Sequence, residues 1–207
     1  MSFYLLDQTL PTLSIAQQQK ALLTLLCVLA YREGDYALTS GRQSSYYINC
    51  KTVTLHPQGA FLVGQCLLHQ LPCETEAVAG MTLGADPILT AVSLASVYPT
   101  SPAPLRNLPA LIVRKQPKGH GTQAWLEGLT LAPNTCVWIL EDVVTTGGSA
   151  LRAAERIQAA GYHVGGILAL VDRLEGAAEA CAQAGLTFRA LFTIEQLRHH
   201  HHQLQQI

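Results

Sequence analysis

The stretch from residue 137 to 149 constrains the fold most, because it joins a buried strand to a helix through two acids and a glycine loop. Residues 137–140 form a short apolar run, partly β-branched, as in strands that are buried on both faces of a parallel sheet. Glu141-Asp142 and then Thr145-Thr146-Gly147-Gly148-Ser149 follow. Residues 150–157 have a strongly helical composition. This order predicts a strand–loop–helix unit of an open α/β sheet.

The glycine loop has the composition of a phosphate-binding site. Glycines let the main chain approach an anion, hydroxyls and N–H groups donate to its oxygens, and the helix N-terminus adds a favourable dipole. The two carboxylates would repel that anion, so we expect them to face ribose hydroxyls or a magnesium ion at the same edge. The loop has neither the lysine of a Walker loop nor the third glycine of a Rossmann loop. An ordinary glycine-rich turn is the alternative.

Length and composition favour one compact domain. The 207 residues suffice for one α/β domain, and 49% of them are hydrophobic while only 13% are charged. A formal net charge of −1 argues against a general nucleic-acid partner. Six scattered cysteines predict small apolar core residues in a reducing, cytoplasmic compartment. The apolar run at 21–30 is too short to span a membrane and predicts a buried helix rather than the core of a signal peptide.

The remaining segments predict alternating helices and strands around an open, mainly parallel twisted sheet. A capping box at Ser14 and Gln17 begins a helix that we expect to run from Ile15 to Arg32 and to stop at Gly34. A polar turn predicts a hairpin over 35–49. Further helices are expected at 57–70, 87–97, 149–161, up to 184 and from 194, and strands at 76–80, 110–113, 125–128, 136–140, 164–171 and 186–192.

A basic cluster follows the strand expected at 110–113. It comprises Arg114, Lys115, Lys118 and His120, interrupted by Pro117, Gly119 and Gly121. Such a run is usually a solvated loop. A basic lid would instead serve a polyphosphate leaving group, since its cations could close over the charge that develops in the transition state. With a phosphate loop in the same chain, we favour the lid.

Arg173 and the histidine run each allow two interpretations. Arg173 directly follows a predicted strand and its Asp172, so it could pair with a neighbouring acid or bind a substrate carboxylate through two parallel hydrogen bonds. The run from His199 to His202 could capture a metal, but neither an acid nor a cysteine stands beside it. We expect the histidines to form a solvated helix face or to be the remnant of an expression tag.

Taken together, these segments resemble the orotate phosphoribosyltransferases, a branch of the type I phosphoribosyltransferase family, and occur in that family's order. The segments are Ser40-Gly41-Arg42 with Tyr46-Tyr47, the loop 114–121, the stretch 141–149, and Asp172-Arg173. The resemblance implies the family's open sheet with a small N-terminal hood in a single domain. Its parts would be an N-terminal helix and hood over about 1–55, a core sheet over about 56–192, and a C-terminal helix and tail over 193–207.

The resemblance also implies an activity and a partner. Orotate would attack phosphoribosyl diphosphate (PRPP), releasing pyrophosphate and forming orotidine 5′-monophosphate in UMP biosynthesis. Magnesium would be held mainly by the diphosphate and ribose rather than directly by protein ligands. The chain would form a homodimer in which the basic loop of one subunit closes over the neighbouring site, with no nucleic-acid or membrane partner.

Individual roles follow from the same resemblance. The catalytic residues would be Lys118 and His120, which stabilise the departing pyrophosphate, and Asp142, which holds the ribose with Glu141. Arg114 and Lys115 would contact the diphosphate. The other residues that bind PRPP would be Val143, Val144, Thr145, Thr146, Gly147, Gly148 and Ser149. Orotate would be bound by Tyr46, Tyr47, Thr145 and Arg173.

The chain departs from the family at two positions in the hood. Ser45 stands where many relatives have proline, and Thr39 where many have lysine, a charge that Arg42 or Lys51 could replace. A phosphoribosyltransferase for another base would keep the glycine loop but would not need Arg173. A non-catalytic, RNA-binding PRPP sensor should have a broader basic face. A degenerate paralogue predicts loss of Lys118 or Asp142, and both are present.

Overall fold

The centre of the protein is a six-stranded sheet, which is seen in a computed structural model that describes residues 10–37, 43–98, 105–117 and 125–206. The strand order is β5-β4-β3-β6-β7-β8, and the pairs are parallel except for β4 with β5. The expected open, mainly parallel sheet is confirmed. The strands are β3 (Ala77–Met81), β4 (Ala110–Val113), β5 (Leu126–Glu127), β6 (Cys136–Val144), β7 (His163–Asp172) and β8 (Phe188–Thr193).

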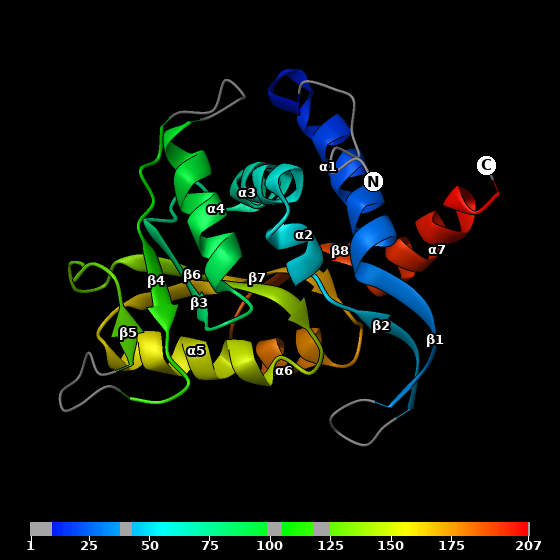
Figure 1. The fold of residues 1–207 in the computed structure, drawn as a ribbon. Helices are drawn as coiled ribbons and strands as arrows, with labels where there is room; N and C mark the ends of the chain where they lie inside the picture. The colour runs from blue at the N-terminus through cyan, green and yellow to red at the C-terminus, as the bar shows by residue number, and fades with distance from the viewer. Residues whose placement is uncertain (1–9, 38–42, 99–104, 118–124, 207) are drawn as a thin grey trace.

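Helices cover both faces of this sheet (Figure 1). One face is covered by α3 (Pro57–Gln70) and α4 (Asp86–Val97), the other by α5 (Gly148–Ala159) and α6 (Ala177–Gln183). Side chains of β6 alternate between the two layers, because successive residues of a strand point to opposite faces. Trp138 and Leu140 belong to the core beneath α3 and α4, whereas Val137 and Ile139 pack with α5.

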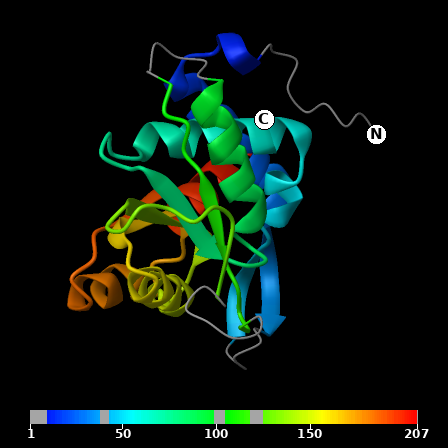
Figure 2. The same ribbon diagram turned by 90° about the vertical axis from the view of Figure 1, so that its left-hand side faces the viewer.

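The N-terminal part forms a helix and a hairpin beside the sheet. A short 3-10 turn, η1 (Leu10–Thr12), precedes α1 (Ile15–Leu25), and a π-helical turn, η2 (Leu26–Ala30), ends it. The antiparallel strands β1 (Tyr31–Ala37) and β2 (Gln43–Ile48) form a hairpin, named the hood here, which extends beyond the sheet in both ribbon views (Figures 1 and 2). The helix α2 (Lys51–Thr54) leads back to the sheet, and α7 (Ile194–Leu204) packs beside α1.

Two predicted boundaries are wrong for the same physical reason. The first helix ends at Ala30 rather than Arg32, because Tyr31 pairs with Ile48 and starts the hood ladder, so that Gly34 lies inside β1 instead of capping a helix. The central strand continues past Leu140 to Val144, because β7 pairs with it as far as Asp172. In both cases hydrogen bonding to a distant strand decides the boundary.

The other predicted features of the termini agree with the structure. Capping boxes are present at Ser14 and at Thr193, which begins α7. The apolar run at 21–30 is helical and contributes five buried residues, namely Leu22, Leu25, Leu26, Cys27 and Ala30. Within the described ranges, no helix combines the length and apolar character that crossing a membrane would require.

Candidate functional site

The predicted phosphate loop lies between the end of β6 and the start of α5. Gly147 adopts φ +82°, a left-handed conformation that favours glycine, and α5 begins at the next residue. The loop encloses a cavity of about 230 Å³. It is lined by Glu141, Val143, Val144, Thr145, Thr146, Gly147, Gly148, Ser149, Ala150 and Arg152. The structure therefore brings the predicted loop residues and one of the two acids around a single cavity.

The two acids are inside the strand and leave it in opposite directions, as alternation requires. Glu141 lines the glycine-loop cavity on the α5 side. Asp142 faces the other side, where its Oδ2 lies 3.8 Å from Nζ of Lys51 on α2. A Cβ added to Gly84 would stand 2.5 Å from Oδ1 of Asp142, so the loop between β3 and α4 packs directly on this carboxylate. The carboxyl groups of Glu141 and Asp142 therefore face opposite sides of the sheet edge.

Glu141 is an unusually buried carboxyl group. Its exposed fraction is 6%, and its Oε1 atom has no hydrogen-bond partner among the described residues. Burial, and secondarily the charge of Asp142, raises its pKa to about 8, although the charges of Arg152 and Lys115 oppose this rise. The carboxyl group is consequently neutral over most of the range below pH 8. An unpaired buried oxygen facing a cavity is suited to a hydroxyl-bearing ligand.

Basic side chains form a second cavity next to the first. It also measures about 230 Å³ and is lined by Met81, Lys115, Ser149, Arg152 and Arg156. Arg152 Nη2 donates to Ser149 Oγ at 3.2 Å, and Arg152 lines both cavities. Sequence reasoning missed Arg152, although its place three residues after Ser149, on the same face of the helix, is a signal that could have revealed it.

The predicted basic lid is only partly described. Arg114 Nη1 forms an ion pair with Glu127 Oε1 at 2.7 Å and lines neither cavity, whereas Lys115 lines the second one. The neighbouring Arg156 stacks over the Trp125 ring at 3.9 Å and donates to the carbonyl of Arg114. Lys118 and His120 lie outside the described residues. Arg114 and Lys115 are adjacent in the sequence, but Arg114 faces Glu127 and Lys115 faces the second cavity.

Arg173 lies at the carboxyl end of β7, beside the start of the glycine loop. Its backbone N–H donates to the Val144 carbonyl at 2.9 Å, which fixes this proximity. Its Nε donates to the Tyr46 hydroxyl at 3.0 Å, and its Nη2 lies 2.9 Å from Glu175 Oε1. The pairing with a neighbouring acid is therefore real, and the Tyr46 contact joins the hood to the sheet edge. Tyr46 is buried, while Tyr47 is exposed and packs against Tyr36.

The histidine run lies on α7 and contacts the N-terminal segments. His200 and Thr24 form a hydrogen bond of 3.0 Å, and His202 Nε2 lies 2.8 Å from Glu33 Oε1. The expectation of a solvated face is wrong for His200 and His201, which are partly buried against α1 and β1. Within the described ranges, no three His, Cys, Asp or Glu side chains are grouped so that they could hold a metal ion.

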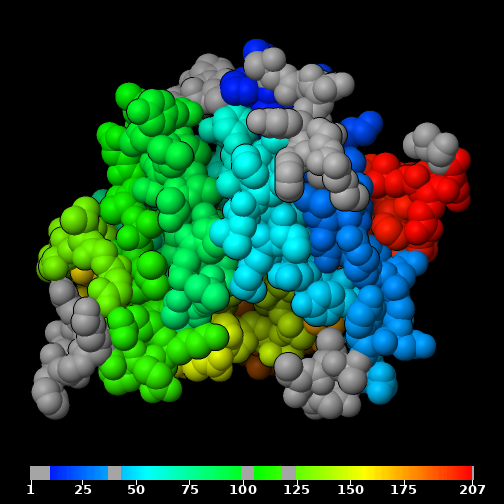
Figure 3. Space-filling view, viewed as in Figure 1, coloured from blue at the N-terminus to red at the C-terminus, as the bar shows by residue number. Residues whose placement is uncertain are grey.

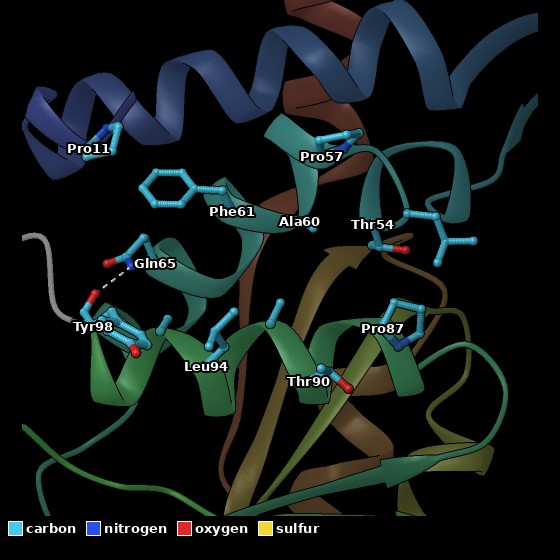
Figure 4. Close-up of a pocket in the computed structure, with 13 residues that line it drawn as sticks. Pro11, Thr54, Pro57, Ala60, Phe61, Gln65, Pro87, Thr90, Leu94 and Tyr98 are labelled. Carbon is cyan, nitrogen blue, oxygen red and sulfur yellow. Dashed lines mark hydrogen bonds between the residues drawn. The ribbon is translucent and has the colours of Figure 1, made fainter. Parts of the chain in front are cut away.

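A larger and largely apolar groove lies elsewhere, between α3 and α4 (Figure 4). It measures about 750 Å³ and shares no lining residue with the glycine-loop cavity. Leu55, Leu94 and Tyr98 belong to its lining and are 68%, 59% and 70% exposed. The surfaces of α3 and α4 adjoin in the space-filling view (Figure 3). Large apolar side chains are therefore exposed together at this groove.

Comparison with known proteins links this geometry to a group of enzymes. No protein-family model matches the chain. The chain is 53% identical over 193 residues to an orotate phosphoribosyltransferase of Nostoc sp., covering 93% of this chain and 91% of the relative. A solved orotate phosphoribosyltransferase of Mycobacterium tuberculosis, in complex with Fe(III) dicitrate, matches with a TM-score of 0.74, 35% identity and coverage of 87% of this chain and 98% of the other. The structure of that enzyme in complex with PRPP matches with a TM-score of 0.68, 33% identity and the same coverage.

Proposed function

The chain belongs to the orotate phosphoribosyltransferase family, and we propose that it transfers the phosphoribosyl group of PRPP to orotate. The products are orotidine 5′-monophosphate and pyrophosphate, and the reaction is a step of pyrimidine (UMP) biosynthesis. Its sheet and hood have the type I phosphoribosyltransferase fold. The observation that carries the proposal is the glycine-loop cavity lined by Glu141, in a chain this similar to known orotate phosphoribosyltransferases.

The sugar phosphate is assigned to the junction of β6 and α5. Main-chain N–H groups and hydroxyls of residues 145–149 would hold the 5′-phosphate at the start of α5, where the helix dipole favours an anion. Glu141 and Asp142 would take the ribose hydroxyls, with Val143 and Val144 shaping the contact. The unpartnered Oε1 of Glu141 supports this role, because a ribose hydroxyl would give that buried oxygen the hydrogen bond it lacks within the protein.

The diphosphate is assigned to the basic segment after β4. Lys115 lines a cavity beside Ser149 of its own chain, so we place it on the substrate bound there. Arg114, Lys118 and His120 would approach from the neighbouring subunit of a homodimer. The outward position of Arg114, paired with Glu127, supports this division. The apolar groove between α3 and α4 is the surface that we assign to the dimer contact.

Magnesium is proposed to arrive with the diphosphate. Mg²⁺ in such sites is bound through substrate phosphates, waters and at most one or two carboxylates, so the diphosphate and ribose would hold most of the ion, and Asp142 at the same sheet edge could complete its coordination. The donor set therefore fits the ion without a dedicated protein cage. When bound, the ion would neutralise charge on the diphosphate.

Orotate is assigned to the space beside Arg173, with Tyr46, Tyr47 and Thr145. The side chain of Arg173 is 11% exposed, so water competes little for its charge, and the substrate carboxylate would share the guanidinium with Glu175. The ring nitrogen of orotate is the nucleophile, so the protein needs only to align the two reactants and to stabilise the charge that develops on the leaving group. The six free cysteines support a reducing, cytoplasmic location.

Pyrophosphate release in the presence of PRPP and Mg²⁺ tests the proposal. Orotate should support turnover, while uracil and adenine, which have no carboxylate for Arg173, should not. Turnover with one of those bases instead would favour a phosphoribosyltransferase for another base. Binding of PRPP without turnover of any base would favour the non-catalytic sensor.

A further inference from the structure

The C-terminal helix α7 covers the face of the hood that carries Tyr46. Glu33 of β1 pairs directly with Tyr46 of β2, and Tyr31 lies two residues earlier, so all three side chains share one face of the hairpin. Two histidines of α7 contact this face. His202 Nε2 lies 2.8 Å from Glu33 Oε1, and the His201 ring lies edge-on to Tyr31 with centroids 5.2 Å apart.

Tyr31 is the centre of this contact. Its side chain is fully buried, and its hydroxyl donates to Glu33 Oε1 at 3.0 Å. Burial raises the pKa of the Tyr31 hydroxyl, and the nearby Arg198 of α7 lowers it. The Tyr31 ring stacks on the Tyr46 ring with centroids 5.9 Å apart and an interplanar angle of 28°. Groups from β1 and α7 therefore fix one aromatic ring, and that ring fixes the next.

Tyr46 connects the Tyr31 ring to Arg173 at the edge of the sheet. Its hydroxyl accepts the hydrogen bond from Arg173 Nε, and the guanidinium carbon of Arg173 lies 4.9 Å from its ring centroid. Arg198 lies over the same ring at 5.7 Å. A guanidinium recognises a carboxylate through two parallel hydrogen bonds, so the orientation of its plane determines the strength of binding.

We propose that Tyr31, Glu33 and Arg198 are positioning residues for orotate, acting through Tyr46 to hold the guanidinium of Arg173 in its binding orientation. The inference rests on the proposed function, in which Arg173 binds the orotate carboxylate. It gives the C-terminal helix a role in substrate affinity, with His202 supporting Glu33. None of these residues lines the cavities at the glycine loop, so PRPP binding does not depend on them.

Tyr31→Phe is the sharpest test, because it keeps the stacked ring and removes only the hydroxyl. The KM for orotate should rise about three- to tenfold, as expected for losing one hydrogen bond of ordinary strength. Glu33→Gln should raise it about two- to fivefold, since its ion pair is half-exposed. In both variants, kcat and the KM for PRPP should stay within about twofold of the unmodified protein. His200→Ala is the matched control, because it removes a contact between α7 and α1 that does not involve Tyr31.

A double-mutant cycle with Arg173→Ala separates the inference from its premise. If the positioning acts through Arg173, adding Tyr31→Phe to Arg173→Ala should cause no further loss of orotate affinity. An Arg173→Ala variant with unaltered orotate affinity would refute the proposed orotate site itself. If Arg173→Ala weakens orotate binding but Tyr31→Phe and Glu33→Gln do not, the positioning role is wrong. Equal increases in both KM values for Tyr31→Phe would also overturn it, because they would indicate a general loss of structure.

Discussion

Replacing Glu141 with glutamine should stabilise the protein, and more so as the pH rises. Burial raises the pKa of Glu141 from its ordinary value near 4.5 to about 8 in the folded state, so folding takes up a proton between these values. Stability is therefore greatest at low pH with respect to this group and falls as the pH increases through 8. Each tenfold change in proton affinity is worth about 1.4 kcal/mol, so the complete effect of the shift from 4.5 to about 8 is on the order of 5 kcal/mol.

Urea denaturation at intervals from pH 5 to pH 9 measures this effect. The difference in free energy of unfolding between the Glu141→Gln variant and the unmodified protein should grow in favour of the variant as the pH rises, and it should level off above about pH 8. The reason is that glutamine keeps the shape of the side chain without a charge to bury. Glu155→Gln, an exposed position on α5, is the control and should follow the unmodified protein. A difference for Glu141→Gln that stays constant with pH would refute the assignment of a neutral, buried carboxyl group.

Three further predictions concern the lid, the loop and the subunit contact. Lys118→Ala should lower kcat at least tenfold with little change in the KM for orotate, because it removes a cation that stabilises the leaving group. Unchanged turnover would exclude the lid from catalysis. Gly147→Ala should raise the KM for PRPP about tenfold, because the backbone angle φ +82° strains any other residue by about 1–3 kcal/mol. An unchanged KM for PRPP would contradict the assignment of the phosphate site. Leu94→Glu should give a monomer in analytical ultracentrifugation, whereas Leu129→Glu, at an even more exposed leucine outside the groove, should not. A dimer with both variants would place the interface elsewhere.

The helix starts that the sequence predicted correctly depend on residues at or next to the start of each helix. Pro57 at the first turn gave the start of α3, and side chains at Ser14 and Thr193 gave the starts of α1 and α7. The boundaries that failed depend on distant partners. Whether Tyr31 continues a helix or starts a strand is decided by Ile48, 17 residues away along the chain, through the hood pairing.

The same distinction applies to the site. The order of residues 141–149 is a local signal, and it predicted the glycine loop before α5 correctly, but it placed the acids after the strand, whereas they lie inside β6. That the acids face opposite sides of the sheet follows only from the extension of β6 beyond Leu140, which β7 enforces. Contacts such as Arg173 with Tyr46 or His202 with Glu33 join residues more than a hundred positions apart, so no pattern in one sequence could reveal them.

A crystal structure with bound orotidine 5′-monophosphate would test the central claim most directly. We predict phosphate oxygens within hydrogen-bonding distance of the main-chain N–H groups of residues 146–149, ribose hydroxyls at Glu141 and Asp142, and the base carboxylate at Arg173. A nucleotide bound away from the junction of β6 and α5, with Gly147 and Asp142 untouched, would contradict it.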